Sequence, residues 1–199
     1  MAASRPPAGR RRAAIAAAAL LLAGGLTACR SRNAADPVMT LLAKTLRHGD
    51  RLLLARALDP EGTRIAAVVV PAAGKPELRF YESKTPGVYG LMHVTQQGDG
   101  FRNLTLEDVD ADGRDEYVVT WEGGHLEIVE VIARGQDGSY TSIFQNAGRQ
   151  VEKRYTPAGQ LEFWITSRTY DEKPGQAPGY ETTVYGWKDG KYLEIPRKQ

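Results

Sequence analysis

Cysteine is nearly absent from this chain of 199 residues, which contains a single one, Cys29. A lone thiol cannot form an internal disulfide, and it cannot build a cysteine-based metal site. The sequence therefore predicts a core that is held together by packing alone.

Histidine is scarce as well, and the common catalytic motifs are missing. The chain has three histidines, His48, His93 and His125, whose spacing suggests neither a metal site nor a catalytic triad. It contains no Gly-Lys-Ser/Thr phosphate loop and no Gly-x-Ser-x-Gly elbow. We expect the histidines to be surface or strand residues, and an enzyme would need a dispersed site.

The chain also lacks a full-length apolar span. Residues 13–28 are 16 uncharged residues, and the segment before them has no acids and four arginines, Arg5, Arg10, Arg11 and Arg12. A membrane helix needs ~20 predominantly apolar residues, and this run is short and rich in alanine and glycine. A basic region followed by a short apolar one is typical of an export signal, so we expect residues 1–28 to be cleaved off.

The end of this segment, Leu26-Thr27-Ala28-Cys29, resembles the lipobox of bacterial lipoproteins. The resemblance implies a thioether-linked diacylglycerol on Cys29, an exported protein anchored to a bacterial membrane through that lipid, and a tether over 29–36. The leaflet stays open. The alternatives are an ordinary secretory signal cleaved after Ala28 and an uncleaved anchor.

Net charge argues against a nucleic-acid partner. Removing the four arginines of the signal from 26 basic residues leaves 22 against 24 acidic ones, a net charge of about −2. A mature protein of this charge has no bulk electrostatic support for binding nucleic acid or anionic lipid.

One helix is predicted at the start of the remaining domain, 37–199. Asp36 is suited to an N-cap and Pro37 to the first helical position. Apolar residues then follow at helical spacing, namely Val38, Leu41, Leu42 and Leu46, with Thr45 between them. We expect a short amphipathic helix over 37–47 whose apolar face packs on the domain.

From Asp50 onward, short runs of β-branched and aromatic residues alternate with glycine, proline and aspartate clusters, which predicts strands and turns. The clearest alternation places Leu161, Phe163 and Ile165 on one face. A weaker one joins Leu52, Leu54 and Leu58, because Arg56 shares their face. Asp-Gly pairs favour hairpin turns, and the best case, Asp189-Gly190, predicts a C-terminal hairpin.

A weak internal repeat appears when loop glycines are aligned. The aligned segments are 58–62, 109–113 and 155–159, each followed by a strand, with offsets of 51 and 46 residues. Such a period fits a unit of about four strands, as in a propeller blade, although three units are fewer than the usual 4–8. We therefore expect a mostly-β fold of antiparallel hairpins in a degenerate or open propeller-like array, with a β-sandwich as the alternative.

The most specific motif lies at 108–119. It places side-chain carboxylates at loop positions 1, 3, 5 and 9 and a glycine at position 6; these are Asp108, Asp110, Asp112, Glu116 and Gly113. Calcium takes 6–8 oxygen ligands, and alternate positions of a tight loop can direct them at one centre. We expect one calcium site made by these four acids and the carbonyl of Arg114, with Asp115 pointing outward.

An EF-hand begins in the same way but needs a bidentate glutamate at position 12, which here is Val119. The strand-like residues Tyr117-Val118-Val119 follow the loop directly. The motif therefore resembles the calcium loops of FG-GAP and VCBS repeats, found in integrin-like propellers and exported bacterial proteins. The resemblance implies a structural rather than a catalytic calcium.

Aromatic residues gather near the C-terminus. Trp164, Tyr185 and Trp187 are candidates for a platform that binds a glycan or a protein, although core packing and cross-strand pairing explain them as well. The sequence thus predicts a non-enzymatic, lipid-anchored, extracytoplasmic binding module. The alternative is an envelope enzyme or enzyme accessory that acts on glycans.

Overall fold

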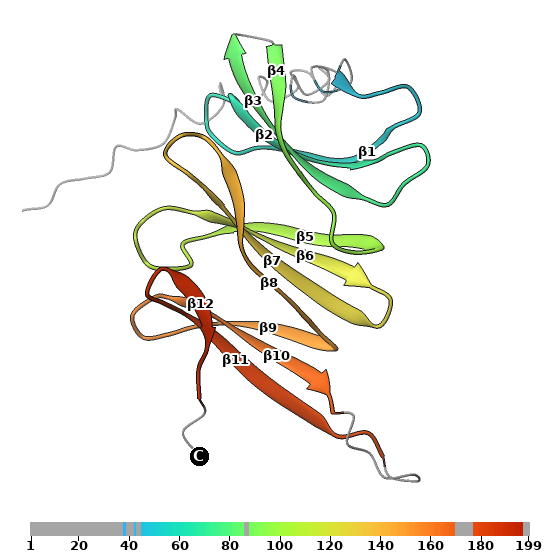
Figure 1. Ribbon diagram of the computed structural model, residues 1–199. Helices are drawn as coiled ribbons and strands as arrows, with labels where there is room; N and C mark the ends of the chain where they lie inside the picture. Colours follow the sequence, from blue (N-terminus) through green and yellow to red (C-terminus); the bar gives the residue numbers. More distant parts are fainter. Residues whose placement is uncertain (1–37, 39–41, 43–44, 86–87, 170–176, 197–199) are drawn as a thin grey trace, which may run out of the picture. The chain divides into compact units, whose positions relative to one another are not determined.

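The computed structural model describes Val38, Leu42 and residues 45–85, 88–169 and 177–196. These residues form twelve strands in three antiparallel sheets of four, each sheet ordered along the chain (Figure 1). The first sheet contains β1 (Arg51–Ala57), β2 (Arg64–Val70), β3 (Glu77–Thr85) and β4 (Val88–Thr95). The second contains β5 (Gly100–Glu107), β6 (Glu116–Gly123), β7 (Leu126–Arg134) and β8 (Tyr140–Gly148). The third contains β9 (Gln150–Tyr155), β10 (Leu161–Arg168), β11 (Tyr180–Lys188) and β12 (Lys191–Glu194). The predicted mostly-β fold is confirmed, and the sheets are open.

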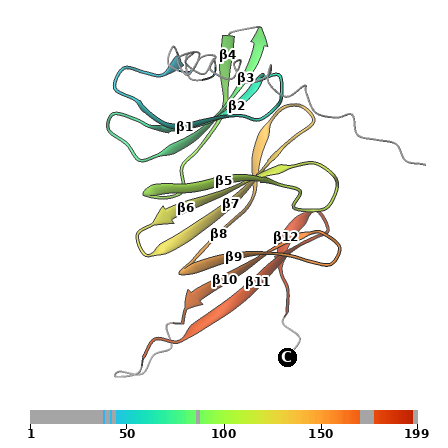
Figure 2. The same cartoon turned by 180° about the vertical axis from the view of Figure 1, so that it is seen from behind.

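The second sheet is buried on both faces. Alternate residues of β6, Tyr117, Val119 and Trp121, join a core with the first sheet, while Val118 faces the core shared with the third. Side chains point alternately to opposite faces of a strand, so a strand covered on both sides needs a continuous apolar run. The residues Tyr117 to Trp121 supply such a run. Figure 2 shows the same three sheets from behind.

The outer face of the first sheet is covered by the segment that precedes β1. Leu42 is fully buried against Ile65, Val69 and Tyr81, and Leu46 packs beside it. The helix predicted over 37–47 lies mostly outside the described residues; Val38, Leu42 and Thr45 have helical backbone. Its apolar residues in the described part pack on the domain, as expected. Among the described residues, no helix has the length and apolarity to cross a membrane.

The two strand patterns of the sequence had different outcomes. Leu161, Phe163 and Ile165 are at most 2% exposed and form one face of β10, which confirms that prediction. In β1 the register with β2 shifts between Leu52 and Leu54. A bulge inserts one residue and reverses the inside-outside parity beyond it, so the simple alternation predicted for this strand fails.

Residues with positive φ occur in the turns that connect the strands. Asp189 and Gly190 have φ of 53° and 78° and form the two-residue connection between β11 and β12, which confirms the predicted hairpin. The first two segments aligned in the sequence fall between the first and second strands of a sheet, and the third begins at the last residue of β9 and runs toward β10. Each carries a glycine with positive φ, at Gly62, Gly113 and Gly159.

Candidate metal centre

The acidic loop connects β5 to β6, whose last pair is Glu107 opposite Glu116. The Asp108 carboxylate accepts hydrogen bonds from the N–H groups of Asp112 at 3.0 Å and Gly113 at 2.9 Å. Ala111 and Gly113 have φ of 65° and 86°, and this left-handed backbone folds the loop back on itself. The turn thus brings the two ends of the acidic segment together.

Three carboxylates converge in this loop. Ligand oxygens of Asp108, Asp110 and Glu116 all lie within 4.8 Å of one another, so the group could hold a metal ion. None of the three forms an ion pair with a basic side chain among the described residues. In the described part of the chain, the donors that meet these carboxylates are backbone N–H groups.

The pKa values of Glu116 and Asp110 are raised in this loop. Partial burial, and then repulsion from Asp110, Asp112 and Asp108, raises the pKa of Glu116 to about 7. Burial, together with Asp112 and Asp108, also raises the pKa of Asp110. Desolvation and like charges both disfavour the ionised form, whereas a bound cation would favour it.

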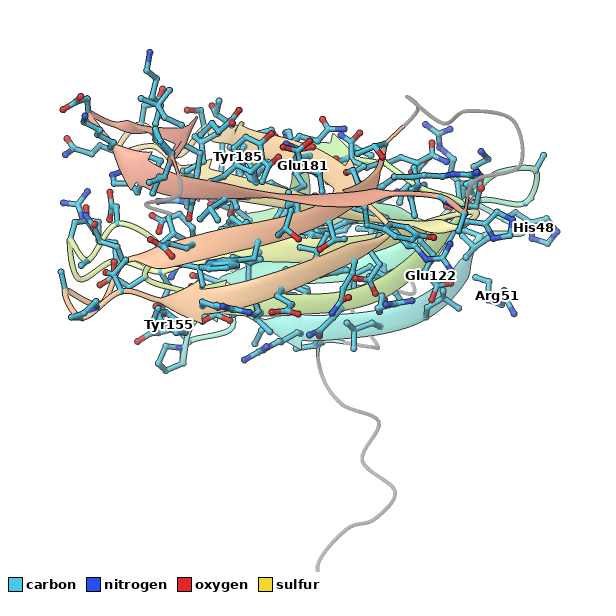
Figure 3. All side chains as sticks on the ribbon, turned by 90° about the horizontal axis from the view of Figure 1, so that it is seen from below. His48, Arg51, Glu122, Tyr155, Glu181 and Tyr185 are labelled. Carbon is cyan, nitrogen blue, oxygen red and sulfur yellow. The ribbon has the colours of Figure 1, made fainter. Side chains whose placement is uncertain are left out.

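The loop is anchored to the interior at one side. Val109 is fully buried; its N–H donates to Glu116 Oε2 at 3.2 Å, and its carbonyl accepts from Leu161 N–H at 3.0 Å. The Tyr155 hydroxyl, in the third sheet, donates a hydrogen bond to the Glu107 carboxylate, which lies beside the loop. Figure 3 shows Tyr155 and Glu122 at opposite ends of the strands, so the loop lies at the Tyr155 end.

The other predicted ligands lie farther out. Asp112 is exposed, and its Oδ1 accepts from the Arg114 N–H at 2.8 Å; it is not one of the three converging acids. Asp115 is exposed, as expected. The carbonyl of Arg114 remains a predicted ligand. Val119 lies within β6, so a strand follows the loop, unlike in an EF-hand.

The structure does not bring the three aromatic candidates together. Tyr185 and Trp187 pack against the core between the second and third sheets, and Trp187 meets its cross-strand neighbour Tyr192 edge to face at 5.4 Å. Trp164 lies opposite Val184 on the other face of the sheet, with the Arg154 guanidinium 3.8 Å above its ring. The packing explanation thus accounts for Tyr185 and Trp187.

The remaining predicted residues lie apart or outside the described part. Cys29 lies outside the described residues. His48 and His125 are exposed, whereas His93 stacks on Tyr140 with ring centroids 6.1 Å apart. None of these three histidines belongs to the group of possible metal ligands found among the described residues.

Sequence reasoning missed one buried acid, Glu130, which is 1% exposed at the contact of the first two sheets. It accepts hydrogen bonds from Thr95 Oγ1 at 2.8 Å and Trp121 Nε1 at 3.4 Å. A glutamate within the apolar run of β7 was the signal that could have revealed it. It ties the two sheets together through polar contacts.

Comparisons with protein-family models, with curated proteins and with solved structures find no match to this chain.

Proposed function

We propose that this protein is a lipid-anchored, extracytoplasmic binding module whose acidic loop holds one structural calcium ion. The observation that carries the proposal is the convergence of Asp108, Asp110 and Glu116 without a basic partner in the described part of the chain. Two like charges 4 Å apart repel by ~1 kcal/mol even at the dielectric constant of water. A divalent cation is the simplest counterion for such a group.

The spacing fits calcium. Calcium–oxygen distances are ~2.3–2.6 Å, so two ligands on opposite sides of one ion lie at most about 5 Å apart. The observed limit of 4.8 Å between ligand oxygens satisfies this condition. Asp112 and the carbonyl of Arg114, together with water, would complete the 6–8 oxygens. The loop joins the consecutive strands β5 and β6, which supports a structural role.

The three sheets support a propeller-like arrangement. Each is a four-stranded meander with an equivalent first loop, and the second is packed between the other two. A sandwich, the alternative architecture, has two sheets. We interpret the array as three consecutive blade-like units of an open propeller, a fold that commonly presents loops for binding.

Calcium binding is tested by thermal unfolding of the purified protein in chelator and in calcium. A hundredfold excess over the dissociation constant should add ~2.7 kcal/mol, a rise in Tm of about 5–10 °C. Asp110→Ala should abolish the rise, and Asp115→Ala, which removes an exposed acid of the same loop, should retain it. A parent protein whose Tm ignores calcium would overturn the metal site.

Lipidation is tested by expressing the chain in a bacterium and measuring the mass of the membrane-bound product. Cleavage before Cys29 with addition of a diacylglycerol is expected. The Cys29→Ser variant should lose the lipid and leave the membrane fraction. An unmodified thiol on the exported protein would contradict the anchor and leave the calcium site unaffected.

A further inference from the structure

A pocket of 450 Å³ lies beside the acidic loop, where the first two sheets meet. Three arginines from three separate elements line it: Arg64 at the start of β2, Arg114 in the loop and Arg134 at the end of β7. We call it the arginine pocket. In the described part of the chain, Asp115 is the one acid that lines it.

Two of the guanidinium groups are held in place by ion pairs with acids outside the pocket. Arg64 Nε pairs with Asp59 Oδ2 at 3.0 Å. Arg134 binds Glu82 through Nε at 2.7 Å and Nη2 at 3.2 Å. Neither acid lines the pocket. The ion pairs therefore orient both side chains and leave the Nη groups of Arg64 and Nη1 of Arg134 outside these contacts.

Arg114 is different, because its side chain is exposed and makes no hydrogen bond or ion pair with any described residue. Tyr117 lines the same pocket. Leu58 and Leu106 add an apolar wall. The pocket thus combines guanidinium donors from three elements with an apolar surface.

We propose that the arginine pocket binds a small phosphate ester. Guanidinium groups present planar forks of N–H donors that match phosphate oxygens, and several of them can bind one tetrahedral anion from different sides. A volume of 450 Å³ falls in the range of small-molecule sites and exceeds what a bare anion needs. The apolar wall would contact the organic part of the ester.

The charges near the pocket set the strength of binding. Asp59 and Glu82 already balance Arg64 and Arg134, and Asp115, which lines the pocket, offsets the charge of Arg114. The attraction therefore comes from the N–H donors of the guanidinium groups and not from an excess of positive charge. The nearby carboxylates of the acidic loop oppose an anion, and a bound calcium would weaken that opposition. We therefore expect a dissociation constant on the order of 10⁻⁴ to 10⁻³ M, lower in calcium than in chelator.

The test is calorimetric titration of the full chain with glycerol phosphate and with inorganic phosphate, each in chelator and in calcium. Arg114→Gln should weaken binding about tenfold or more, because a charge-assisted hydrogen bond is lost. Arg51→Gln is the matched control: it removes one exposed positive charge at the opposite end of the strands and should have no effect (Figure 3). Equal Tm values of the two variants would establish that both are folded.

Binding that Arg114→Gln weakens and Arg51→Gln preserves supports the pocket. A preference for glycerol phosphate over inorganic phosphate identifies an ester rather than the free ion. No heat with either probe, or equal weakening in both variants, overturns the proposal. The calcium site is judged separately by its own thermal shift, since Arg114→Gln keeps the backbone carbonyl and all the loop acids.

Discussion

The loops that join the first two strands of each sheet occupy equivalent places and balance their charges in three different ways. The first, 58–63, has Asp59, whose carboxylate is occupied by Thr63 and Arg64. The second, 108–115, directs several carboxylates at one point with no basic partner in the described residues. The third, 156–160, has no acid and uses the Thr156 hydroxyl, which accepts from Gln160 N–H at 3.1 Å.

Loop length explains the difference. The second loop has eight residues between its strands, against six in the first and five in the third. The additional residues let the backbone turn at Ala111 before Gly113, and Asp108, Asp110 and Glu116 converge. In the shorter first loop, one aspartate caps the turn and one arginine neutralises it. Thus the same place in a repeated unit can hold an ion pair, a metal ligand set or a neutral turn.

The largest expected effect comes from breaking the first loop. Asp59→Ala removes the acceptor of Thr63 N–H at 2.7 Å and of Arg64 Nε at 3.0 Å from a side chain that is 9% exposed. We expect the free energy of unfolding to fall by about 2–3 kcal/mol, measured by urea denaturation. The loss should be the same in calcium and in chelator. A calcium-dependent loss would mean that the first loop also binds metal.

The next largest effect is expected at the three glycines with positive φ, which test whether the three loops share the same backbone conformation. Alanine at Gly62, Gly113 or Gly159 would meet no atom closer than 4.0 Å, so the cost is confined to the backbone. Each substitution should destabilise the protein by about 1–2 kcal/mol. Urea denaturation of the three variants should give similar values. A neutral effect at one of them would show that this loop relaxes to another conformation.

The dependence of stability on pH should distinguish the second loop from the other two. The pKa of Glu116 is raised from 4.5 to about 7 in the folded protein, so the folded state binds the proton more tightly than the unfolded state. Stability in chelator should therefore be greatest below pH 4.5 from this group and fall as the pH rises to 7, by on the order of 1 kcal/mol after solvent screening. Glu116→Gln should remove that slope in pH-dependent Tm measurements. Calcium affinity should fall as the pH drops below 7, because the proton competes with the ion.

The smallest effect is expected in the third loop. Thr156→Ala deletes one hydrogen bond to Gln160 N–H and should cost about 0.5–1 kcal/mol in the same urea assay. Thr156→Ser, which keeps the hydroxyl, is the matched control and should stay close to the parent. A loss above 2 kcal/mol would mean that this loop carries more of the fold than its contacts indicate.

Local sequence patterns predicted the strand at Leu161–Arg168 and the turn at Asp189-Gly190. The alternation at Leu161, Phe163 and Ile165 and the Asp189-Gly190 hairpin depend on residues adjacent in the chain, and both are confirmed. The same reasoning failed in β1, because a bulge near Leu53 is set by pairing with β2. It also could not separate a binding platform from a core at Tyr185, which packs beside Phe144 of another sheet.

The candidate metal centre was predictable in outline for a similar reason. Asp108, Asp110 and Glu116 belong to one short segment of the chain, and their spacing alone suggests convergence. The position of Asp112, exposed and turned to the Arg114 N–H, depends on the backbone path through Ala111, which is not a glycine although its φ is positive. The raised pKa of Glu116 depends on burial, which a sequence does not report.

The sequence by itself determined what short-range chemistry controls: the mostly-β character, the turn at Asp189-Gly190 and an acidic loop suited to calcium. Only the tertiary structure decided what depends on residues distant in the chain. It stacked three open sheets so that the second is buried on both faces, placed Glu130 between two of them, and brought Arg64, Arg114 and Arg134 around one pocket. Burial and electrostatic interaction act through space, so the sequence pattern alone could not place them.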